Sequence, residues 1–357
     1  MAYVPILKSK QGEFIALREL KAETKKYVTP LIEIIPIQFD YAKSIPKKSL
    51  KNHVTDVLNN LKKIWSEQLP IYLDTSLLNE GKEGVSEVYD QLKELNLNYI
   101  PVVTVEENLK YSVLFKDIIL QKANGFCLRL SSSHITNPNF KFDVLNIINQ
   151  YKINISEVDL LLDLGDISKA QQDQINLYEF ALRMLIGMLE IFNDFRKVIF
   201  VSGSFPADLS DISSGSKKLL PREEWKLYKK IINYPNAKNF IYGDYGTNNK
   251  AIIEGDPRMM RIGAAIRYTV DDFILVLKGY AINNPYYDGF GQFHELSSII
   301  RNSEYFTGSS FSWGDNYIFF CSQRLNSSGN KSTWVAISTN HHIEFVAHQL
   351  SNFDASL

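Results

Sequence analysis

Short apolar segments alternate with longer amphipathic segments along the first two thirds of the chain. The short segments are rich in Val, Ile, Leu and Tyr, as buried strands are, and the longer ones space their apolar residues three or four apart, as helices do. This alternation indicates βα units around a parallel sheet. Eight strands are predicted, at residues 3–8, 30–36, 70–75, 99–105, 125–130, 159–165, 198–203 and 240–245.

The eight units occupy roughly the 250 residues that a (β/α)8 barrel needs. A doubly wound open sheet is the alternative, and it usually carries a glycine-rich turn after its first strand. The segment KSKQGEF after the first predicted strand has only Gly12. We therefore predict a (β/α)8 TIM-like barrel over residues 1–258.

The alternation stops after residue 245. Two strands joined at Asp271 and Asp272, two short apolar segments and two helices are predicted there, at residues 264–270, 273–280, 317–322, 333–338, 293–303 and 342–351. They predict a small C-terminal α+β extension over residues 259–357, packed on the barrel. His341 and His342 precede the last predicted helix and are interpreted as a solvated cap.

Composition narrows the class of protein. The 357 residues are 45% hydrophobic and 22% charged, which is ordinary for a globular chain, and the net charge of −1 gives no general attraction to nucleic acid or membranes. Cys127 and Cys321 lie far apart, which argues against a disulfide framework and a thiolate metal site. Without a signal-peptide core or an apolar run of about 18 residues, we expect a cytoplasmic protein with no membrane partner.

The polar residues of the predicted strands suggest a site. Side chains alternate between the two faces of a strand, and in the predicted strands the polar residues share one parity and most of them come late. Barrel enzymes carry their chemistry at the carboxyl ends of the strands. We therefore predict convergence at one mouth of Lys8, Glu33, Asp74, Glu106, Arg129, Asp163, Ser202 and Asp244.

Several carboxylates with few nitrogen ligands suit Mg2+ or another hard divalent cation, for which Asp74 and Asp163 are the predicted ligands. This set predicts metal-assisted hydrolysis of a phosphoester in a nucleotide or nucleic acid. The predicted catalytic residues are Glu33, Asp74, Asp163 and Asp244. The predicted substrate-binding residues are Lys8, Arg129, Ser202, Ser204 and Tyr242.

Other interpretations stay open. A carboxylate pair is also suited to acid–base attack on a glycosidic bond. Catalysis through a Schiff base on Lys8 is a less favoured alternative, because neighbouring acids would keep that lysine protonated. The carboxylates can also form structural ion pairs with Lys8 or Arg129. None of the six histidines ends a predicted barrel strand, and Walker, HExxH and GxSxG motifs are absent, which removes several hydrolase classes.

Two segments outside the predicted mouth are candidates for binding. Residues 202–218 form a long polar loop that could cover the mouth or bind a partner. Residues 286–293 combine aromatic residues with glycines, which suits stacking on a base or packing in a core.

Several short motifs resemble those of the phage-type "beta protein" family. They are YVPILKSKQGEFIAL (residues 3–17), PLIEI (30–34), YLDT (72–75), LRL (128–130), LLDLGDI (161–167), SGSFP (202–206), YGDYG (242–246) and IRYTV (266–270). The resemblance implies a component or effector of an antiphage or mobile-element system. It also implies a protein partner encoded in the same operon, and supplies no catalytic residues. A non-catalytic barrel that recognises a protein partner or phage component is the alternative to the hydrolase.

Overall fold

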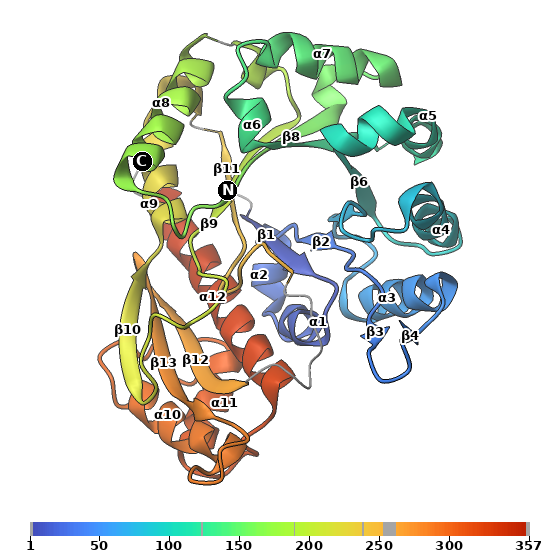
Figure 1. Ribbon diagram of the computed structural model, residues 1–357. Helices are drawn as coiled ribbons and strands as arrows, with labels where there is room; N and C mark the ends of the chain where they lie inside the picture. The colour runs from blue at the N-terminus through green and yellow to red at the C-terminus, as the bar shows by residue number, and fades with distance from the viewer. Residues whose placement is uncertain (1–2, 123, 189, 238, 253–261, 355–357) are drawn as a thin grey trace. The chain divides into compact units, whose positions relative to one another are not determined.

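Eight parallel strands close into a barrel (Figure 1). The structure is a computed structural model, which describes residues 3–122, 124–188, 190–237, 239–252 and 262–354. Around the barrel the strand order is β1-β11-β9-β8-β7-β6-β5-β2. The bounds are β1 Tyr3–Lys8, β2 Leu31–Glu33, β5 Ile71–Asp74, β6 Tyr99–Thr104, β7 Phe126–Ser131, β8 Val158–Asp166, β9 Lys197–Gly203 and β11 Ile241–Asp244. The predicted (β/α)8 barrel is confirmed.

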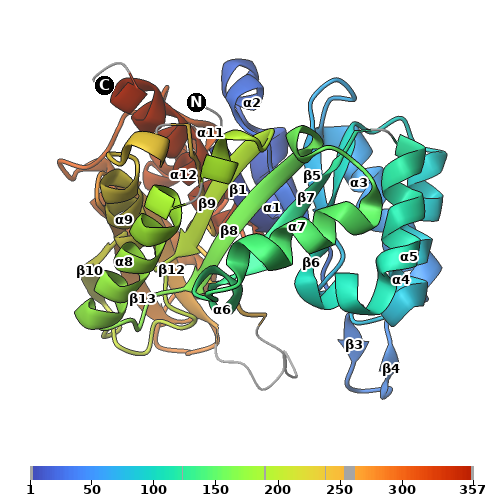
Figure 2. The same ribbon diagram turned by 90° about the horizontal axis from the view of Figure 1, so that it is seen from above.

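Helices follow the strands and lie outside them (Figure 2). In α3, Val54, Val57, Leu58 and Leu61 form one buried face, while Ser49 caps the first turn by accepting a hydrogen bond from the backbone of Asn52. The other helices of the barrel show the same division into buried and exposed faces. Their bounds are α3 Leu50–Ile64, α4 Gly81–Lys93, α5 Val105–Lys122, α6 Ser132–Ile135, α7 Phe140–Tyr151, α8 Gln172–Met188 and α9 Glu223–Ile231.

Two short strands lie outside the barrel sheet. β3 Phe39–Asp40 and β4 Ile45–Pro46 form a two-stranded hairpin between β2 and α3.

Side chains fill the interior of the barrel. One buried cluster draws on all eight barrel strands and comprises Val4, Ile6, Leu31, Tyr72, Ile100, Val102, Cys127, Leu161, Ile199, Val201, Ile241 and Tyr245. The barrel is therefore packed along its axis, as barrels of this strand number are.

The chain divides into two compact units. The barrel unit comprises Met1–Ser9, Val28–Gly203 and Glu223–Tyr245. The second unit comprises Lys10–Tyr27, Ser204–Arg222 and Gly246–Leu357. Its three segments follow β1, β9 and β11, which are neighbours in the barrel. The predicted boundary at residue 258 lies outside the described residues.

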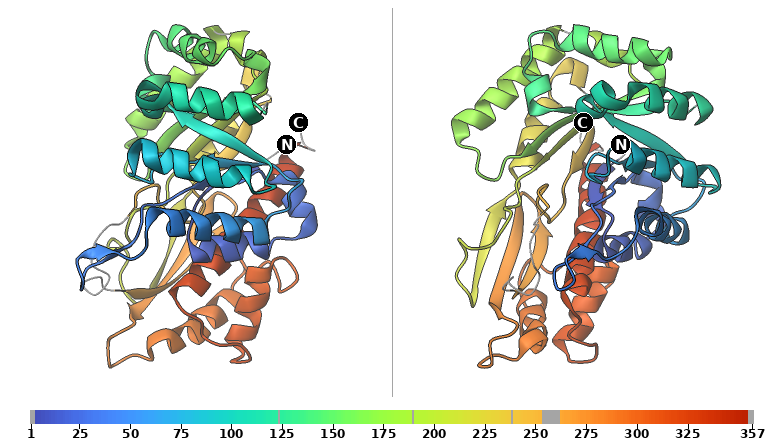
Figure 3. Two further views of the ribbon diagram at one scale, coloured as in Figure 1. Left: turned by 90° about the vertical axis from the view of Figure 1, so that its right-hand side faces the viewer. Right: turned by 45° about the vertical axis from the view of Figure 1, so that its right-hand side comes forward.

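The second unit has its own sheet and core (Figure 3). A three-stranded antiparallel sheet has the order β10-β13-β12. Its elements are α1 Gln11–Arg18, α2 Ala22–Tyr27, β10 Ser216–Pro221, β12 Gly263–Val270, β13 Phe273–Ala281, α10 Gln292–Arg301, α11 Trp313–Ser322 and α12 Lys331–Asp354. Ile266, Leu277, Ile300, Ile318 and Trp334 are among the residues of the core that joins this sheet to its helices.

Several predictions for this unit need correction. The polar loop at residues 202–218 contains the start of strand β10 at Ser216. The segments 317–322 and 333–338 are helical, because they belong to α11 and α12. His341 and His342 are fully buried inside α12 and are no solvated cap. No helix in the described ranges is both long and apolar enough to cross a membrane.

Candidate functional site

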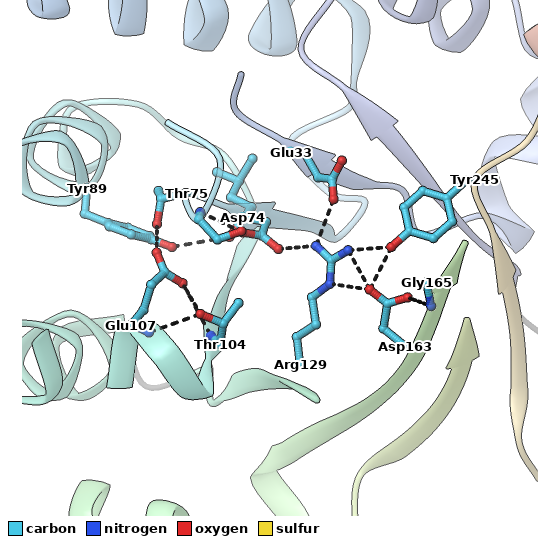
Figure 4. A network of polar contacts seen from close by, with 12 residues as sticks. Glu33, Asp74, Thr75, Tyr89, Thr104, Glu107, Arg129, Asp163, Gly165 and Tyr245 are labelled. Atoms are coloured by element: carbon cyan, nitrogen blue, oxygen red, sulfur yellow. Dashed lines mark hydrogen bonds and ion pairs between the residues drawn. The ribbon is translucent and has the colours of Figure 1, made fainter. Parts of the chain in front are cut away.

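One arginine joins three carboxylates near the carboxyl ends of the barrel strands (Figure 4). Arg129 on β7 donates from Nη1 to Oε1 of Glu33 at 2.9 Å and to Oδ2 of Asp74 at 2.5 Å. It also donates from Nε and Nη2 to Oδ2 of Asp163, at 3.1 and 2.8 Å. The Tyr245 hydroxyl accepts from Nη2 of Arg129 and donates to Asp163, both at 2.7 Å. We call these five residues the Arg129 cluster.

The Arg129 cluster is shielded from solvent. Arg129 exposes 6% of its surface, and Glu33, Asp74 and Asp163 expose 1% or less. Burial by itself lowers the pKa of Arg129, but Tyr245 and the three carboxylates together raise it well above its ordinary value. The guanidinium is therefore charged at all accessible pH values and neutralises part of the surrounding negative charge.

Glu33 is the carboxylate of the cluster with spare hydrogen-bonding capacity. Burial raises its pKa, and of its neighbours Arg129 and Lys8 lower that pKa whereas Asp74 raises it. Its Oε2 atom is buried without a hydrogen-bond partner in the described part of the chain. Lys8, 6% exposed, lies opposite Glu33 in the β1–β2 register. Lys8, Glu33, Asp74, Arg129 and Asp163 therefore lie close together, as the sequence analysis predicted.

A second buried carboxyl group lies beside Asp74. Glu107 near the start of α5 accepts hydrogen bonds from Thr75 Oγ1 at 2.8 Å and Thr104 Oγ1 at 3.1 Å. Burial, followed by the charge of Asp74, raises the pKa of Glu107 to about 7. The sequence prediction had chosen Glu106 instead, but β6 ends at Thr104 and the helix that follows leaves Glu106 exposed.

Strands β9 and β11 present the opposite faces to those predicted. The prediction placed Ser202, Tyr242 and Asp244 inside the barrel, and this is wrong. The interior cluster takes the alternate positions of these strands, which are Ile199, Val201, Ile241 and Tyr245. Asp244 instead accepts hydrogen bonds from Tyr3 at 2.6 Å and Tyr242 at 2.9 Å. Tyr242 packs edge-on against Trp225 of α9, with ring centroids 5.2 Å apart.

Gly243 explains why the inward face of β11 was predicted wrongly. Gly243 occupies the inward position between Ile241 and Tyr245, where a Cβ atom would lie 2.7 Å from the Val4 carbonyl oxygen. Glycine is neither clearly polar nor clearly apolar, so the inward position of β11 could not be recognised from Gly243. The prediction therefore followed the polar residue Asp244 and assigned the wrong face of β11 to the interior. Tyr245 was missed for the same reason, although its parity with Ile241 is visible in the sequence.

The two serines predicted to bind substrate lie elsewhere. Ser202 is buried on β9 and donates to the Gly165 carbonyl at 3.3 Å. Ser204 belongs to the second unit, where it donates to the Pro221 carbonyl at 2.9 Å. Both serine hydroxyls thus donate to backbone carbonyls of residues outside the Arg129 cluster.

A second ion pair closes the other end of the barrel strands. Arg196 donates to both oxygens of Asp159, at 2.8 and 2.7 Å, and the Tyr72 hydroxyl donates to Asp159 at 2.7 Å. Asp159 is fully buried. Both ends of the barrel interior thus hold a carboxylate–arginine network, with the apolar cluster between them.

Comparisons with known proteins identify the family of this chain. A family model described as "Beta protein" matches residues 3–348. The chain belongs to the Beta protein family. No curated protein matches it. Among solved structures, it is similar to the 3-dehydroquinate dehydratase from Aquifex aeolicus VF5, at 12% identity over 72% of this chain and 93% of that chain, with a TM-score of 0.36.

The Arg129 cluster of this Beta protein does not fit the predicted metal. In the described ranges, no group of three or more His, Cys, Asp and Glu side chains is placed to hold a metal ion. The guanidinium of Arg129 lies between Asp74 and Asp163, where a shared cation would have to bind. Asp74 and Asp163 are already paired, so we derive no metal chemistry from them.

Proposed function

We propose that this Beta protein is a non-catalytic barrel that binds a protein partner of a phage or mobile-element system. The observation that supports this best is the Arg129 cluster, in which one buried guanidinium pairs with all three carboxylates. A buried, mutually paired set of this kind provides neither a metal site nor a freely accessible acid and base.

The use of the segments after the strands also supports a binding function. Barrel enzymes build their sites from the loops at the carboxyl ends of the strands. Here the segments that follow β1, β9 and β11 build a second unit with its own sheet and core. These three segments therefore fold as parts of that unit.

Strand β10 offers the clearest docking edge. It lies at one edge of its sheet and, among the described strands, pairs with β13 alone, with Leu220 opposite Ile274 and Lys218 opposite Val276. The backbone N–H of Arg222 donates to the Asp272 carbonyl, so Arg222 and every second residue before it direct their backbone groups toward β13. Lys217 and Leu219 lie between these positions and direct their N–H and C=O groups away from β13.

The side chains of β10 indicate the partner's chemistry. Lys217 and Lys218 are exposed, lie on opposite faces of the strand, and form no salt bridge within the part of the chain that the structure describes. Two unpaired lysines repel the same edge of a second copy and attract an acidic strand. The proposed partner therefore adds an extended, acidic segment to β10.

The test is complex formation with the products of the neighbouring genes. Co-expressed partner and tagged protein should elute together, and Leu219→Pro should weaken the complex at least about tenfold by removing one outward N–H. Leu219→Ala, which keeps that N–H, is the matched control and should retain binding. Glu33→Gln should also retain it, because the Arg129 cluster has no role in docking.

An enzyme would give a different result. The same preparations are assayed for hydrolysis of a phosphodiester such as bis-p-nitrophenyl phosphate with Mg2+. Turnover by the wild type that Glu33→Gln abolishes, together with a complex indifferent to Leu219→Pro, would overturn the proposal.

A further inference from the structure

Three cationic side chains of the second unit gather without a salt bridge. They are Lys10, Arg267 and Lys331, and none has a carboxylate oxygen within ion-pair distance in the described part of the chain. Burial lowers the pKa of Lys331, and so do the charges of Lys10 and Arg267. Burial also lowers the pKa of Arg267 to about 10, which Glu13 only partly offsets. Lys331 and Arg267 are therefore partly desolvated, and Glu13 offsets the charge of Arg267 only in part.

Packing of two helices brings the lysines together. Lys10 is the N-cap residue of α1 and makes no side-chain capping bond, and Lys331 is the first residue of α12. The first turns of these helices touch, since a Cβ atom on Gly12 would lie 2.8 Å from the Ser332 carbonyl oxygen. The free N–H groups of a first turn carry partial positive charge, so both helices add to the positive potential of the two lysines.

Arg267 is held with one edge of its guanidinium free. Its Nη1 donates to the carbonyl of Thr247 at 2.9 Å and to Oδ1 of Asn248 at 2.7 Å. The guanidinium lies 4.7 Å from the ring centroid of Phe205, which orients its plane. No described residue accepts a hydrogen bond from Nε or Nη2, the two donors that together fit two oxygens of one anion.

Two further observations point to an anion. The hydroxyl of Thr247, whose carbonyl binds Arg267, is buried with no hydrogen-bond partner among the described residues. Asn248 also donates to Oε1 of Glu13 at 3.1 Å, which places one negative charge near three positive ones. The surplus of about two positive charges matches a phosphate dianion better than a single carboxylate.

We propose that Lys10, Arg267 and Lys331 bind a phosphate group, either free or carried by a nucleotide. This site is separate from the β10 edge and goes beyond the proposed protein-binding function. Arg267 supplies two parallel N–H donors, and the two lysines supply charge at the helix starts.

The experiment is a titration of the full-length protein with inorganic phosphate at constant ionic strength, and calorimetry measures the heat of binding. We expect saturation with a Kd of about 1 mM or lower. Lys331→Gln should weaken binding about tenfold, and Arg267→Lys, which keeps the charge but loses the planar pair of donors, should weaken it similarly. Lys62→Gln on α3 removes an equal charge from the barrel surface and should change nothing.

Further measurements distinguish the ligand source and guard against misfolding. A nucleoside monophosphate that binds more tightly than phosphate identifies a nucleotide, and equal affinities identify the phosphate group alone. Lys331→Gln should also raise the melting temperature of the phosphate-free protein slightly, because it removes a like charge from the cluster. No binding by the wild type at about 10 mM phosphate, or equal binding by all variants, overturns the proposal.

Discussion

Nε and Nη2 of Arg129 both donate to one oxygen atom, Oδ2 of Asp163, on the neighbouring strand. The remaining nitrogen, Nη1, serves Glu33 and Asp74. A single guanidinium thus connects β2, β5, β7 and β8 across the barrel interior. Its role in this geometry is to hold the strand ends together and to balance buried negative charge.

Removal of that charge should destabilise the barrel strongly. Arg129→Met leaves three buried carboxylates without their cation, and we expect a loss of about 3–5 kcal/mol in the free energy of unfolding at pH 8. The loss should be smaller at pH 5, because the carboxyl groups can then take up protons. Urea denaturation at the two pH values measures both effects. Equal stability of wild type and variant at pH 8 would contradict the assigned role.

Glu107 should make stability depend on pH near neutrality. Its pKa rises from 4.5 to about 7 in the folded protein. A raised carboxyl pKa means that the folded state prefers the protonated form, so this contribution falls as pH increases from about 4.5 to about 7. At about 1.4 kcal/mol for each tenfold change in proton affinity, the difference is roughly 3 kcal/mol.

Glu107→Gln should therefore flatten the stability profile between pH 5 and 8 and raise stability most at the alkaline end. Thermal melting across this pH range measures the effect. Glu106→Gln, on the exposed neighbouring residue, is the matched control and should leave the profile unchanged. A profile that both variants share with the wild type would show that Glu107 ionises normally.

The same substitution at two glycines should have opposite effects. Gly243→Ala places a methyl group 2.7 Å from the Val4 carbonyl oxygen and 2.8 Å from Cγ2 of Val201, which should cost about 1–3 kcal/mol. Gly187→Ala adds a methyl group to the exposed side of α8 with nothing within 4 Å, which should stabilise by about 0.5 kcal/mol. Chemical denaturation of both variants gives the comparison, and a neutral Gly243→Ala would show that the barrel interior is looser than described.

His341 should be essential to the second unit. Its Nδ1 faces Oδ2 of Asp315 at 2.9 Å and its Nε2 faces the Thr269 carbonyl at 2.9 Å. Both partners accept hydrogen bonds, so each ring nitrogen of His341 faces an acceptor. Burial raises the pKa of Asp315, but the charge of His341 and the hydrogen bonds from His341, Ser312 and Tyr268 together lower it below its ordinary value.

His341→Gln removes this charge pair from a fully buried place and should cost about 3 kcal/mol or more. Because the folded pKa of Asp315 is depressed, its contribution is present above its unfolded pKa and is lost as pH falls through the lower folded value. His348→Gln changes an exposed histidine of the same helix and is the control. Tryptophan fluorescence follows the unfolding of both units, because Trp313 and Trp334 lie in this unit and Trp65 and Trp225 lie in the barrel unit.

The order of apolar and polar residues along the chain predicts the barrel and most of the charged residues inside it. Strand-length apolar segments separated by helix-length amphipathic ones leave few ways to bury all the apolar faces, and a closed parallel barrel is one of them. Lys8, Glu33, Asp74, Arg129 and Asp163 could be placed on one side because each is a polar residue late in a mostly apolar strand, where its parity determines its face.

Long-range contacts determine the faces of β9 and β11, the formation of β10 at the end of the loop at residues 202–218, and the burial of His341. In each case the deciding partner is distant along the chain. Gly243 faces inward because the backbone of Val4 passes close to it, β10 forms because β13 pairs with it, and His341 is buried because Asp315 and Thr269 satisfy its nitrogens. Local polarity records none of these long-range contacts, which exist only after the chain has folded.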